Sequence, residues 1–244
     1  MKSIIIAAGL ALLGAGALSA ITAEEILREM EANRVHRTER AEGSMIITDR
    51  FGSRTKTFVL YAEGADKMLI EFTNPEERGQ KIMRLEDEIY LYFPDAEEVI
   101  RLQGSALKES VMGSDFSYED MTGERELLDL YRARLLDTVA DGGRRLYVLE
   151  LEARERGVAY PRQKIWVDAE RLVLDRAEYY ALSDRLLKSL EVLEVMQVAG
   201  KNVPSRLIMR DEMKKKSSTE FAVSSLRINE PLPAGIFSLE SLSW

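Results

Sequence analysis

The stretch from residue 75 to residue 121 constrains the fold more than any other part of the chain. Its sequence, PEERGQKIMRLEDEIYLYFPDAEEVIRLQGSALKESVMGSDFSYEDM, joins alternating strand patterns to a short segment rich in serine, glycine and methionine. That segment has helical spacing, and none of its side chains forms a pattern typical of a catalytic group. The combination predicts a sheet covered by a movable apolar insert, and it therefore favours a binding function.

Three segments alternate apolar and polar residues with a period of two, namely 66–72, 88–93 and 162–168. This period places successive side chains on opposite faces and is typical of half-buried antiparallel strands. The other face carries charged or hydroxyl-bearing residues in each segment, namely Lys67 and Glu71, then Glu88, Tyr90 and Tyr92, and then Arg162, Lys164 and Asp168. The apolar residues that we expect on the inner face are Met68, Ile70, Phe72, Ile89, Leu91, Phe93, Ile165 and Val167.

Turn signals built from glycine, asparagine, aspartate and proline recur at short intervals, for example at 51–53, 63–65, 141–143 and 200–202. Such residues supply the backbone angles that hairpins need. The spacing predicts about ten or eleven strands. Because we find no internal repeat and no long linker, the simplest fold is one large, strongly curved antiparallel sheet.

Three segments break the strand pattern. Residues 23–34 have the spacing of an amphipathic helix, with acidic residues in the first turn. Residues 105–112 predict one or two helical turns with Leu107, Val111 and Met112 on one side, and residues 117–131 predict a helix interrupted at Gly123. Helices beside a curved sheet can close one side of it or can fill an ordinary core, and the pattern leaves both interpretations open.

The N-terminus indicates the compartment. A lysine at position 2 precedes an apolar run from residue 4 to residue 18, and small residues follow. Roughly 15 apolar residues are few for a membrane span, so residues 1–20 predict a secretory signal peptide with cleavage between 19 and 23, against the alternative of a retained anchor helix. The chain has no cysteine, hence no lipidation site. Export without disulfides fits a periplasmic protein.

Roughly 220 residues remain after this segment, which is enough for one β domain, residues 21–244, with a sizeable core. The net charge is −8, so the chain lacks the basic field of a nucleic-acid-binding protein. The basic run from Lys214 to Lys216 lies between two predicted strands. We interpret it as a solvated hairpin turn, with contact to anionic lipid headgroups as the alternative.

Catalytic and metal-binding patterns are weak. The single histidine, His36, is interpreted as a surface residue, and one histidine without cysteine cannot form a usual zinc or copper cluster. The acidic run at 115–120 lacks the spacing of a calcium loop, so we expect a solvated loop or a helix N-terminus. No serine lies in a nucleophile elbow, and no phosphate-binding loop occurs. We therefore expect no catalytic residue, no metal and no cofactor.

The chain has ten methionines, most of them in predicted strands or in the helical insert. Methionine often fills cores, but it also forms adaptable surfaces for flexible ligands. The sequence favours neither reading over the other.

Residues 75–121 resemble the LolA-like outer-membrane lipoprotein-sorting family of periplasmic carriers. The most specific match is SVMGSDFSYEDM at 110–121, and the Arg78-Gly79 turn and the strand ending in Tyr92-Phe93-Pro94 also match. KIWVD at 164–168 and PLPAGIF at 231–237 are similar to the central and closing segments of that family. Together these motifs extend through nearly all of the chain after the predicted signal peptide.

The resemblance implies a mainly β fold with short helices, an unclosed antiparallel half-barrel with a helical lid and an apolar concave face. It implies a periplasmic carrier that moves lipid or lipoprotein acyl chains toward the outer membrane. An inner-membrane transporter would supply the cargo and an outer-membrane acceptor would receive it. In LolA a strand arginine holds the lid, and Arg54, Arg84 and Arg101 are the candidates here. The predicted lipid-binding residues are Met68, Ile70, Phe72, Ile89, Leu91, Phe93, Leu107, Val111, Met112, Phe116, Ile165 and Val167.

Three other functions remain open. One is an accessory component of an export complex that binds a protein partner in the same groove. The second is an enzyme, which would require a convergent polar pocket. The third is an outer-membrane barrel, suggested by the terminal Trp244 but opposed by the charges on its strand faces. We expect a monomeric carrier that binds phospholipid or lipoprotein acyl chains and no nucleic acid.

Overall fold

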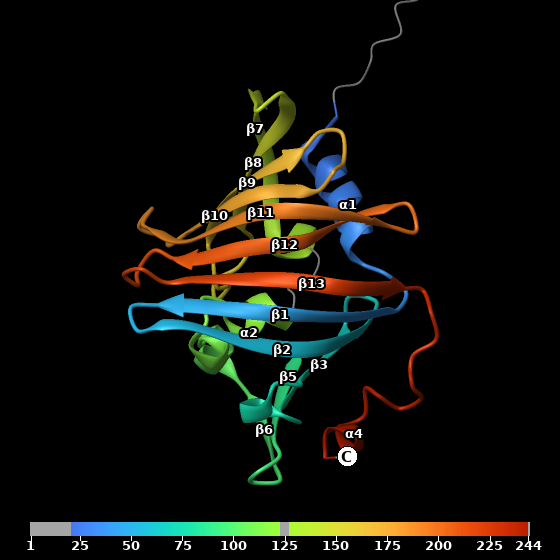
Figure 1. The fold of residues 1–244 in the computed structure, drawn as a ribbon. Coiled ribbons are helices and arrows are strands. Elements are labelled where there is room, and N and C mark those ends of the chain that lie inside the picture. Colours follow the sequence, from blue (N-terminus) through green and yellow to red (C-terminus); the bar gives the residue numbers. More distant parts are fainter. Residues whose placement is uncertain (1–20, 123–126, 244) are drawn as a thin grey trace, which may run out of the picture.

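A computed structural model describes residues 21–122 and 127–243. The predicted signal peptide, residues 1–20, lies outside the described residues, as does Gly123. The fold is mainly β: one antiparallel sheet with a few short helices (Figure 1). The helices are α1 (Ala23–Arg34), α2 (Tyr118–Thr122), α3 (Leu127–Leu130) and α4 (Leu239–Leu242), and 3₁₀ turns span Pro75–Glu77, Gly104–Lys108 and Val111–Gly113.

The sheet has thirteen strands in the described part of the chain. The first six are β1 (Glu39–Asp49), β2 (Gly52–Glu63), β3 (Lys67–Phe72), β4 (Lys81–Leu85), β5 (Glu88–Phe93) and β6 (Glu98–Leu102). The other seven are β7 (Tyr131–Asp141), β8 (Arg144–Ala153), β9 (Arg162–Asp168), β10 (Leu174–Tyr180), β11 (Leu186–Val198), β12 (Lys201–Asp211) and β13 (Ser218–Ile228).

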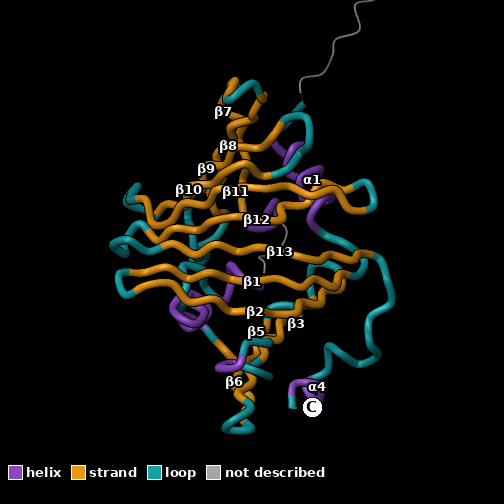
Figure 2. The backbone as a smooth tube through the Cα atoms, viewed as in Figure 1, coloured by secondary structure: helices purple, strands orange, loops and turns teal. Residues whose placement is uncertain are grey.

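The order of the strands follows from short hairpins and one long-range pairing. The order is β6-β5-β4-β3-β2-β1-β13-β12-β11-β10-β9-β8-β7. Strands that follow one another in the sequence are therefore paired, except that β1 pairs with β13 and that β6 and β7 lie at opposite edges. Strands β1 and β13 join the two ends of the chain at the centre of the sheet, with Met45 opposite Phe221. Strands β6 and β7 form the two edges, so the sheet is unclosed (Figure 2).

The sequence predictions for individual elements are largely confirmed. The helix at 23–34 is α1, which begins after a capping box formed by Thr22 and Glu25. The segments 88–93 and 162–168 are β5 and β9, and 66–72 corresponds to β3. The number of strands is higher than the ten or eleven expected. The edge strand β6 is exposed on both faces over most of its length, so it leaves no alternating pattern to read.

The helical insert differs from its prediction in detail. Residues 105–112 form two 3₁₀ turns rather than a regular helix, and Met112 interrupts them with a left-handed backbone. The partly helical segment expected at 117–131 appears as α2 and α3, after which Tyr131 begins strand β7.

One apolar cluster on a single face of the sheet forms the main core. Its fully buried members include Ile26 and Leu27 of α1 together with Met45, Phe72 and Tyr131 from strands on both sides of the centre. We call this the inner face. The β1–β13 pairing shifts between Glu42 and Gly43, where Ser224 of β13 is the extra residue, and Gly43 leaves room for the Phe58 ring: an added Cβ would lie 2.7 Å from it.

The C-terminal segment covers part of the opposite, outer face. Leu242 of α4 is fully buried in a second cluster with Leu69, Met83 and Tyr92. The Lys81 ammonium donates to the Ser241 carbonyl at 2.9 Å. Strands β3–β5 are therefore buried on both faces, whereas most of the sheet is buried on one.

Candidate functional site

The connection between the two edge strands must cross the sheet. The described residues between β6 at one edge and β7 at the other, 103–122 and 127–130, are called the crossing segment. In Figure 1 this segment, in green, lies behind strands β13, β1 and β2, on the side where α1 also packs. The chain connection between the two edge strands therefore places these residues over the inner face.

Apolar contacts attach the middle of the crossing segment to the centre of the sheet. Val111, Phe116 and Met121 are buried members of the main core. The Phe116 ring lies 6.2 Å from the Phe221 ring, which stacks on Phe58 at 4.9 Å. Such aromatic contacts stabilise by more than their buried area alone.

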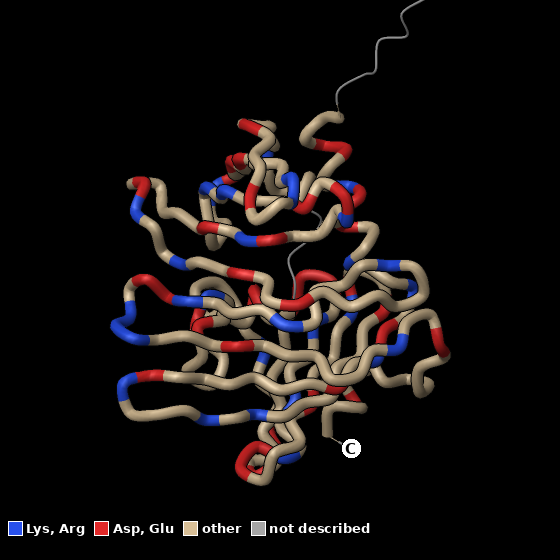
Figure 3. The backbone as a smooth tube through the Cα atoms, turned by 45° about the horizontal axis from the view of Figure 1, so that its top comes forward, with Lys and Arg blue, Asp and Glu red and all other residues tan. Residues whose placement is uncertain are grey.

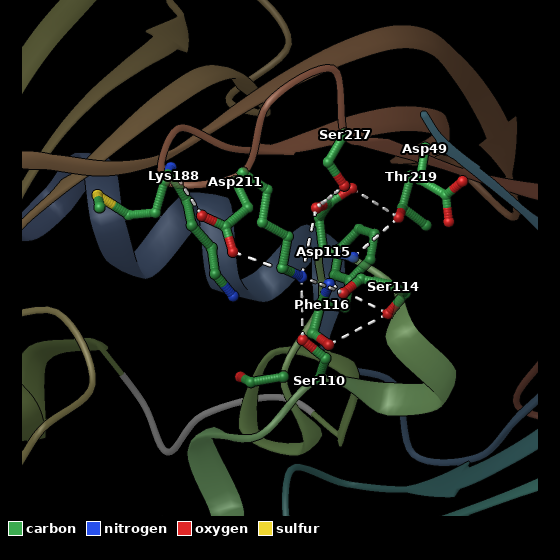
Figure 4. A network of polar contacts seen from close by, with 12 residues as sticks. Asp49, Ser110, Ser114, Asp115, Phe116, Lys188, Asp211, Ser217 and Thr219 are labelled. Atoms are coloured by element: carbon green, nitrogen blue, oxygen red, sulfur yellow. Dashed lines mark hydrogen bonds and ion pairs between the residues drawn. The ribbon is translucent and has the colours of Figure 1, made fainter. Parts of the chain in front are cut away.

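A buried carboxylate forms the first polar attachment (Figure 4). The Asp115 side chain accepts hydrogen bonds from the Ser217 hydroxyl at 2.6 Å and the Thr219 hydroxyl at 2.9 Å, and its backbone N–H donates to Thr219. Asp115 is 1% exposed. The expectation of a solvated acidic loop is therefore wrong at this position, because the β12–β13 hairpin supplies donors that the local sequence does not reveal.

The same hairpin contributes a lysine. The Lys214 ammonium donates to the Ser110 hydroxyl and the Ser114 carbonyl, both at 3.1 Å, and lies 3.7 Å from the Asp115 carboxylate. It is also 3.5 Å from Asp211. The run at 214–216 does form the turn of a hairpin, but Lys214 is a structural contact rather than a solvated turn residue.

A second carboxylate of the crossing segment is bound at β11. The Asp120 side chain accepts from the Lys188 ammonium at 2.8 Å and from the Tyr160 hydroxyl at 2.9 Å. Both ends of this ion pair are largely buried. Because removal of one partner from such a pair leaves an uncompensated charge, the pair fixes α2 firmly when it is formed.

A third attachment comes from β4. Arg84 is buried, and its guanidinium donates to the Thr122 carbonyl at the end of α2 at 3.3 Å and to the Glu86 carbonyl at 2.7 Å. The other two candidate arginines form more exposed ion pairs, Arg54 with Asp49 and Arg101 with Glu88. Arg84 is thus the buried member of the three and contacts the crossing segment directly.

An apolar cavity of about 260 Å³ lies between α1, the crossing segment and strands β9–β12. Its walls are mostly aliphatic and aromatic, which is the usual character of a small-ligand site. The carboxylate of Asp120 and the hydroxyl of Tyr160, which are bound to each other, provide part of the polar lining. Its central lining residues are Phe116, Ile165, Leu174, Ala177, Tyr179, Leu190, Val192, Leu207 and Met209.

A larger cleft of about 410 Å³ lies on the other side of α2. Its lining is mixed, with Arg84, Ile89, Leu107 and Glu119 joined by the loop between β8 and β9. Burial raises the pKa of the Glu119 carboxyl, which the nearby Lys108 partly opposes. Short helices α2 and α3 contribute residues to both spaces.

All of the predicted site residues belong to, or pack against, the main core on the inner face. The predicted alternation of β3, β5 and β9 is therefore correct. Four of them border a cavity: Ile89 and Leu107 border the larger cleft, and Phe116 and Ile165 border the apolar cavity. The remaining predicted residues, which lie in the packed core, are Met68, Ile70, Phe72, Leu91, Phe93, Val111, Met112 and Val167.

The sequence analysis did not identify the residues of β10–β12 that line the apolar cavity. Leu190 and Val192 do alternate in β11, and Leu207 and Met209 alternate in β12. This period-two signal was available, but bulges in β11 at 192–195 interrupt it. Tyr160 lies in a loop, so no periodicity could have revealed it.

His36 is not a surface residue. It is 7% exposed, and its Nε2 atom has no hydrogen-bond partner in the described part of the chain. Burial lowers the pKa of the imidazole, and Lys201 lowers it further. Among the described residues no group of three or more His, Cys, Asp or Glu side chains could hold a metal ion.

None of the helices in residues 21–122 and 127–243 is long and apolar enough to cross a membrane.

A family model described as uncharacterized protein matches residues 64–244. A DUF1329 family protein from Desulfovibrio piger is 26% identical, with a TM-score of 0.83 over 89% of this chain and 96% of that one. An outer membrane lipoprotein-sorting protein domain from Vibrio parahaemolyticus is 25% identical, with a TM-score of 0.82 over 90% and 97%.

A LolA superfamily protein from Nitrosomonas europaea, 23% identical, has a TM-score of 0.76 over 91% of this chain and 100% of that one. No functionally curated protein matches the sequence. The resemblance stated from the sequence is confirmed, and the fold is LolA-like.

Proposed function

Because the chain belongs to a family of uncharacterized proteins and has the LolA-like fold, we propose that it is a carrier that shelters acyl chains in water. The cargo is a lipid or the acyl chains of a lipoprotein, carried across the periplasm toward the outer membrane. The description of the similar Vibrio protein as a lipoprotein-sorting domain supports this direction.

The observation that carries the proposal is the apolar cavity between α1, the crossing segment and β9–β12. Each methylene removed from water contributes about 0.8 kcal/mol, so a space lined by aliphatic side chains stabilises an acyl chain in proportion to the length that it accepts. Phe116, Asp120 and Leu127 of the crossing segment form part of the cavity wall, so a movement of this segment would give the site a means of loading.

Loading requires the crossing segment to move. Its apolar contacts with the centre of the sheet are backed by three polar attachments, at Asp115, Asp120 and Thr122. Hydrogen bonds of this kind each contribute only about 1–3 kcal/mol net, so cargo contacts can compensate for their loss. We propose that Arg84 holds this segment closed and that the glycines at 104 and 113 allow it to swing.

With the segment displaced, the predicted residues now packed in the core would join the cavity. Phe72, Leu91 and Val111 would then face cargo together with Ile165 and Leu190. In this proposal all twelve predicted residues contact acyl chains in the loaded state. In the unloaded structure four of the twelve border a cavity.

The proposal assigns residues 1–20 to a signal peptide and residues 21–244 to one carrier domain. The chain has no cysteine, so no lipidation can anchor it to a membrane through that residue. The protein would act as a monomer between an inner-membrane transporter and an outer-membrane acceptor, and the chemistry is binding rather than catalysis.

The test is native mass spectrometry of protein secreted and purified without detergent, followed by lipid extraction and displacement of a fluorescent fatty acid. We expect bound lipid, and we expect Ala177→Phe, which fills the apolar cavity, to weaken fatty-acid binding at least tenfold. Ala140→Phe adds the same ring on the exposed part of β7 and should leave binding unchanged.

Circular dichroism of both variants checks that the sheet is intact. Equal affinity in the two variants would place the lipid elsewhere. A stable complex with a periplasmic protein and no bound lipid would instead support the alternative of an accessory component of an export complex.

A further inference from the structure

Three neighbouring hairpin tips on one side of the sheet carry exposed apolar side chains. Phe51 at the β1–β2 tip is 81% exposed, Leu182 at the β10–β11 tip is 86% exposed, and Met213 at the β12–β13 tip is 48% exposed. Figure 1 shows these tips in a row at the left of the sheet. We call the segments 49–54, 181–186 and 210–217 the tip row.

The strand register places the three tips beside one another. Thr48 of β1 pairs with Ser218 of β13, and Lys188 of β11 pairs with Asp211 of β12. The Arg185 guanidinium of one tip contacts the Met213 sulfur of the next. The apolar residues therefore form one surface and are not three unrelated loops.

The tip row is basic on an acidic protein. It contains seven lysines and arginines and four acidic residues, whereas the whole chain has a net charge of −8. Three of the acidic residues are in ion pairs: Asp49 with Arg54, Asp184 with Arg162 and Asp211 with Lys214. Lys215 and Lys216 are exposed. Figure 3 shows blue segments at the tips along the left side of the molecule.

In the tip row a basic side chain lies directly against an exposed apolar one. The Arg50 guanidinium lies 4.5 Å from the centre of the exposed Phe51 ring. An aromatic or aliphatic side chain flanked by cations is suited to the boundary between headgroups and acyl chains, where the apolar part inserts and the charge binds phosphate.

The other large apolar residues exposed in the described part of the chain do not share this setting. Val99 and Ile100 lie on edge strand β6, Leu136 on edge strand β7 and Leu193 within β11, and Leu239 belongs to α4. Large exposed apolar side chains at hairpin tips are thus confined, among the described residues, to the tip row.

We propose that the tip row docks on the surface of an anionic bilayer, with Phe51, Leu182 and Met213 entering the headgroup region and the basic residues binding phosphates. This inference goes beyond cargo binding, because the tip row is separate from both cavities. It also orients the carrier: Lys214 belongs to the tip row and bonds the crossing segment at Ser110 and Ser114, so docking would bring that attachment to the membrane.

The test uses the full chain after removal of residues 1–20 and exploits the absence of cysteine. Phe51→Cys, Leu182→Cys and Met213→Cys are each labelled with a polarity-sensitive fluorophore and mixed with phosphatidylglycerol or phosphatidylcholine vesicles. We expect a blue shift with phosphatidylglycerol that salt reverses, and little shift with phosphatidylcholine. Leu136→Cys, labelled in the same way, should not shift.

Vesicle sedimentation of unlabelled variants measures the contributions. The pair Lys215→Gln and Lys216→Gln should weaken partitioning about 30-fold, since each lysine near an anionic surface contributes about fivefold. The triple change of Phe51, Leu182 and Met213 to Ser should weaken it at least roughly tenfold. Lys214 is retained in every variant because it also holds the crossing segment.

Arg132→Gln with Arg145→Gln is the matched control for charge, and Leu136→Ser with Leu193→Ser removes two exposed apolar side chains elsewhere on the sheet. The proposal is overturned if the wild type ignores anionic vesicles at low salt, if it binds neutral ones equally well, or if the controls weaken binding as much as the tip variants. Capture of a protein at the tips without vesicle binding would also overturn it. Fatty-acid displacement, measured separately, should be unchanged in the tip variants.

Discussion

The two halves of the sheet are built differently. Strands β2–β5 are covered on the inner face by the crossing segment and on the outer face by the C-terminal segment, and four successive residues of β4, from Lys81 to Arg84, are buried. Strands β9–β12 border the apolar cavity on the inner face. Their outer face has no cover from the C-terminal segment, and in the described part of the chain only a small cluster of Leu146, Val148 and Trp166 is buried at β8–β9, with the Trp166 ring between Arg176 and Lys164 at 4.7 and 4.9 Å.

The two groups of strands therefore contribute differently, one mainly to the stability of the fold and the other mainly to the space for a ligand. A closely packed region stabilises the fold through dispersion contacts and buried area, but it has no space for a ligand. A region that borders a cavity gives up part of that stability and offers space for cargo once the crossing segment has moved. We interpret β2–β5, which border the mixed cleft at Arg84 and Ile89, as the packed half that holds the fold, and β9–β12, which line the apolar cavity, as the cavity half that receives acyl chains first.

The sharpest test of this comparison removes the same side chain from each half. Leu91 in β5 borders neither of the two cavities, whereas Leu190 in β11 lines the apolar cavity, and both are nearly buried. We expect Leu91→Ala to lower the free energy of unfolding by about 3–4 kcal/mol and Leu190→Ala by about 2 kcal/mol, because a residue beside a void has fewer contacts to lose. Urea denaturation measures both.

Comparable losses in the two variants would mean that the halves are equally packed. Fatty-acid displacement adds a second comparison, in which we expect Leu190→Ala to alter the affinity more than Leu91→Ala does, because Leu190 already lines the cavity.

A pH experiment probes the boundary between the halves. Glu39 begins β1, one of the two central strands, and burial raises the pKa of its carboxyl to about 7, although Arg34 opposes the shift. Below pH 4.5 the carboxyl is protonated in both the folded and the unfolded chain. As pH rises from there to 7, the unfolded chain loses the proton first, so the free energy of unfolding falls.

We expect this fall to amount to about 2–3 kcal/mol. Glu39→Gln should therefore be more stable than the wild type at pH 8 and similar to it at pH 4, as measured by thermal unfolding across pH. Glu42→Gln, an exposed change on the same strand, should follow the wild-type curve. Parallel curves for Glu39→Gln and the wild type would contradict the assignment.

The smallest effect concerns how the crossing segment is attached. Asp115→Ala removes the acceptor of the Ser217 and Thr219 hydroxyls. We expect a local loss of about 2 kcal/mol, so amide hydrogens of residues 110–122 should exchange about 30-fold faster. Amides of β3 and β4 in the packed half should change little.

Asp95→Ala, a change at the exposed β5–β6 turn, is the matched control and should leave exchange unaltered. If exchange in β3 and β4 accelerated as much as in the crossing segment, that segment would be an integral part of the packed half and not a separately movable element.

Residues whose environment is set by local periodicity were predicted well. Ile70, Leu91 and Ile165 lie on the inner face as their alternation required, and α1 begins and ends at the expected residues. The solvated loop expected at Asp115 is wrong, since its partners lie about 100 residues further along the chain, whereas Asp120 does lie in the first turn of a helix as the other expectation had it. Distance along the sequence, and not residue type, separates the two outcomes.

The sequence by itself determined the antiparallel sheet, the amphipathic first helix, the inner apolar set and the family, because side-chain period and short motifs are local properties. Tertiary structure alone decided that β1 pairs with β13, and that residues 103–130 must consequently pass from one edge of the sheet to the other. It also decided where packing stops and a cavity begins. Void volume depends on how side chains from distant strands meet, and no single segment carries that information.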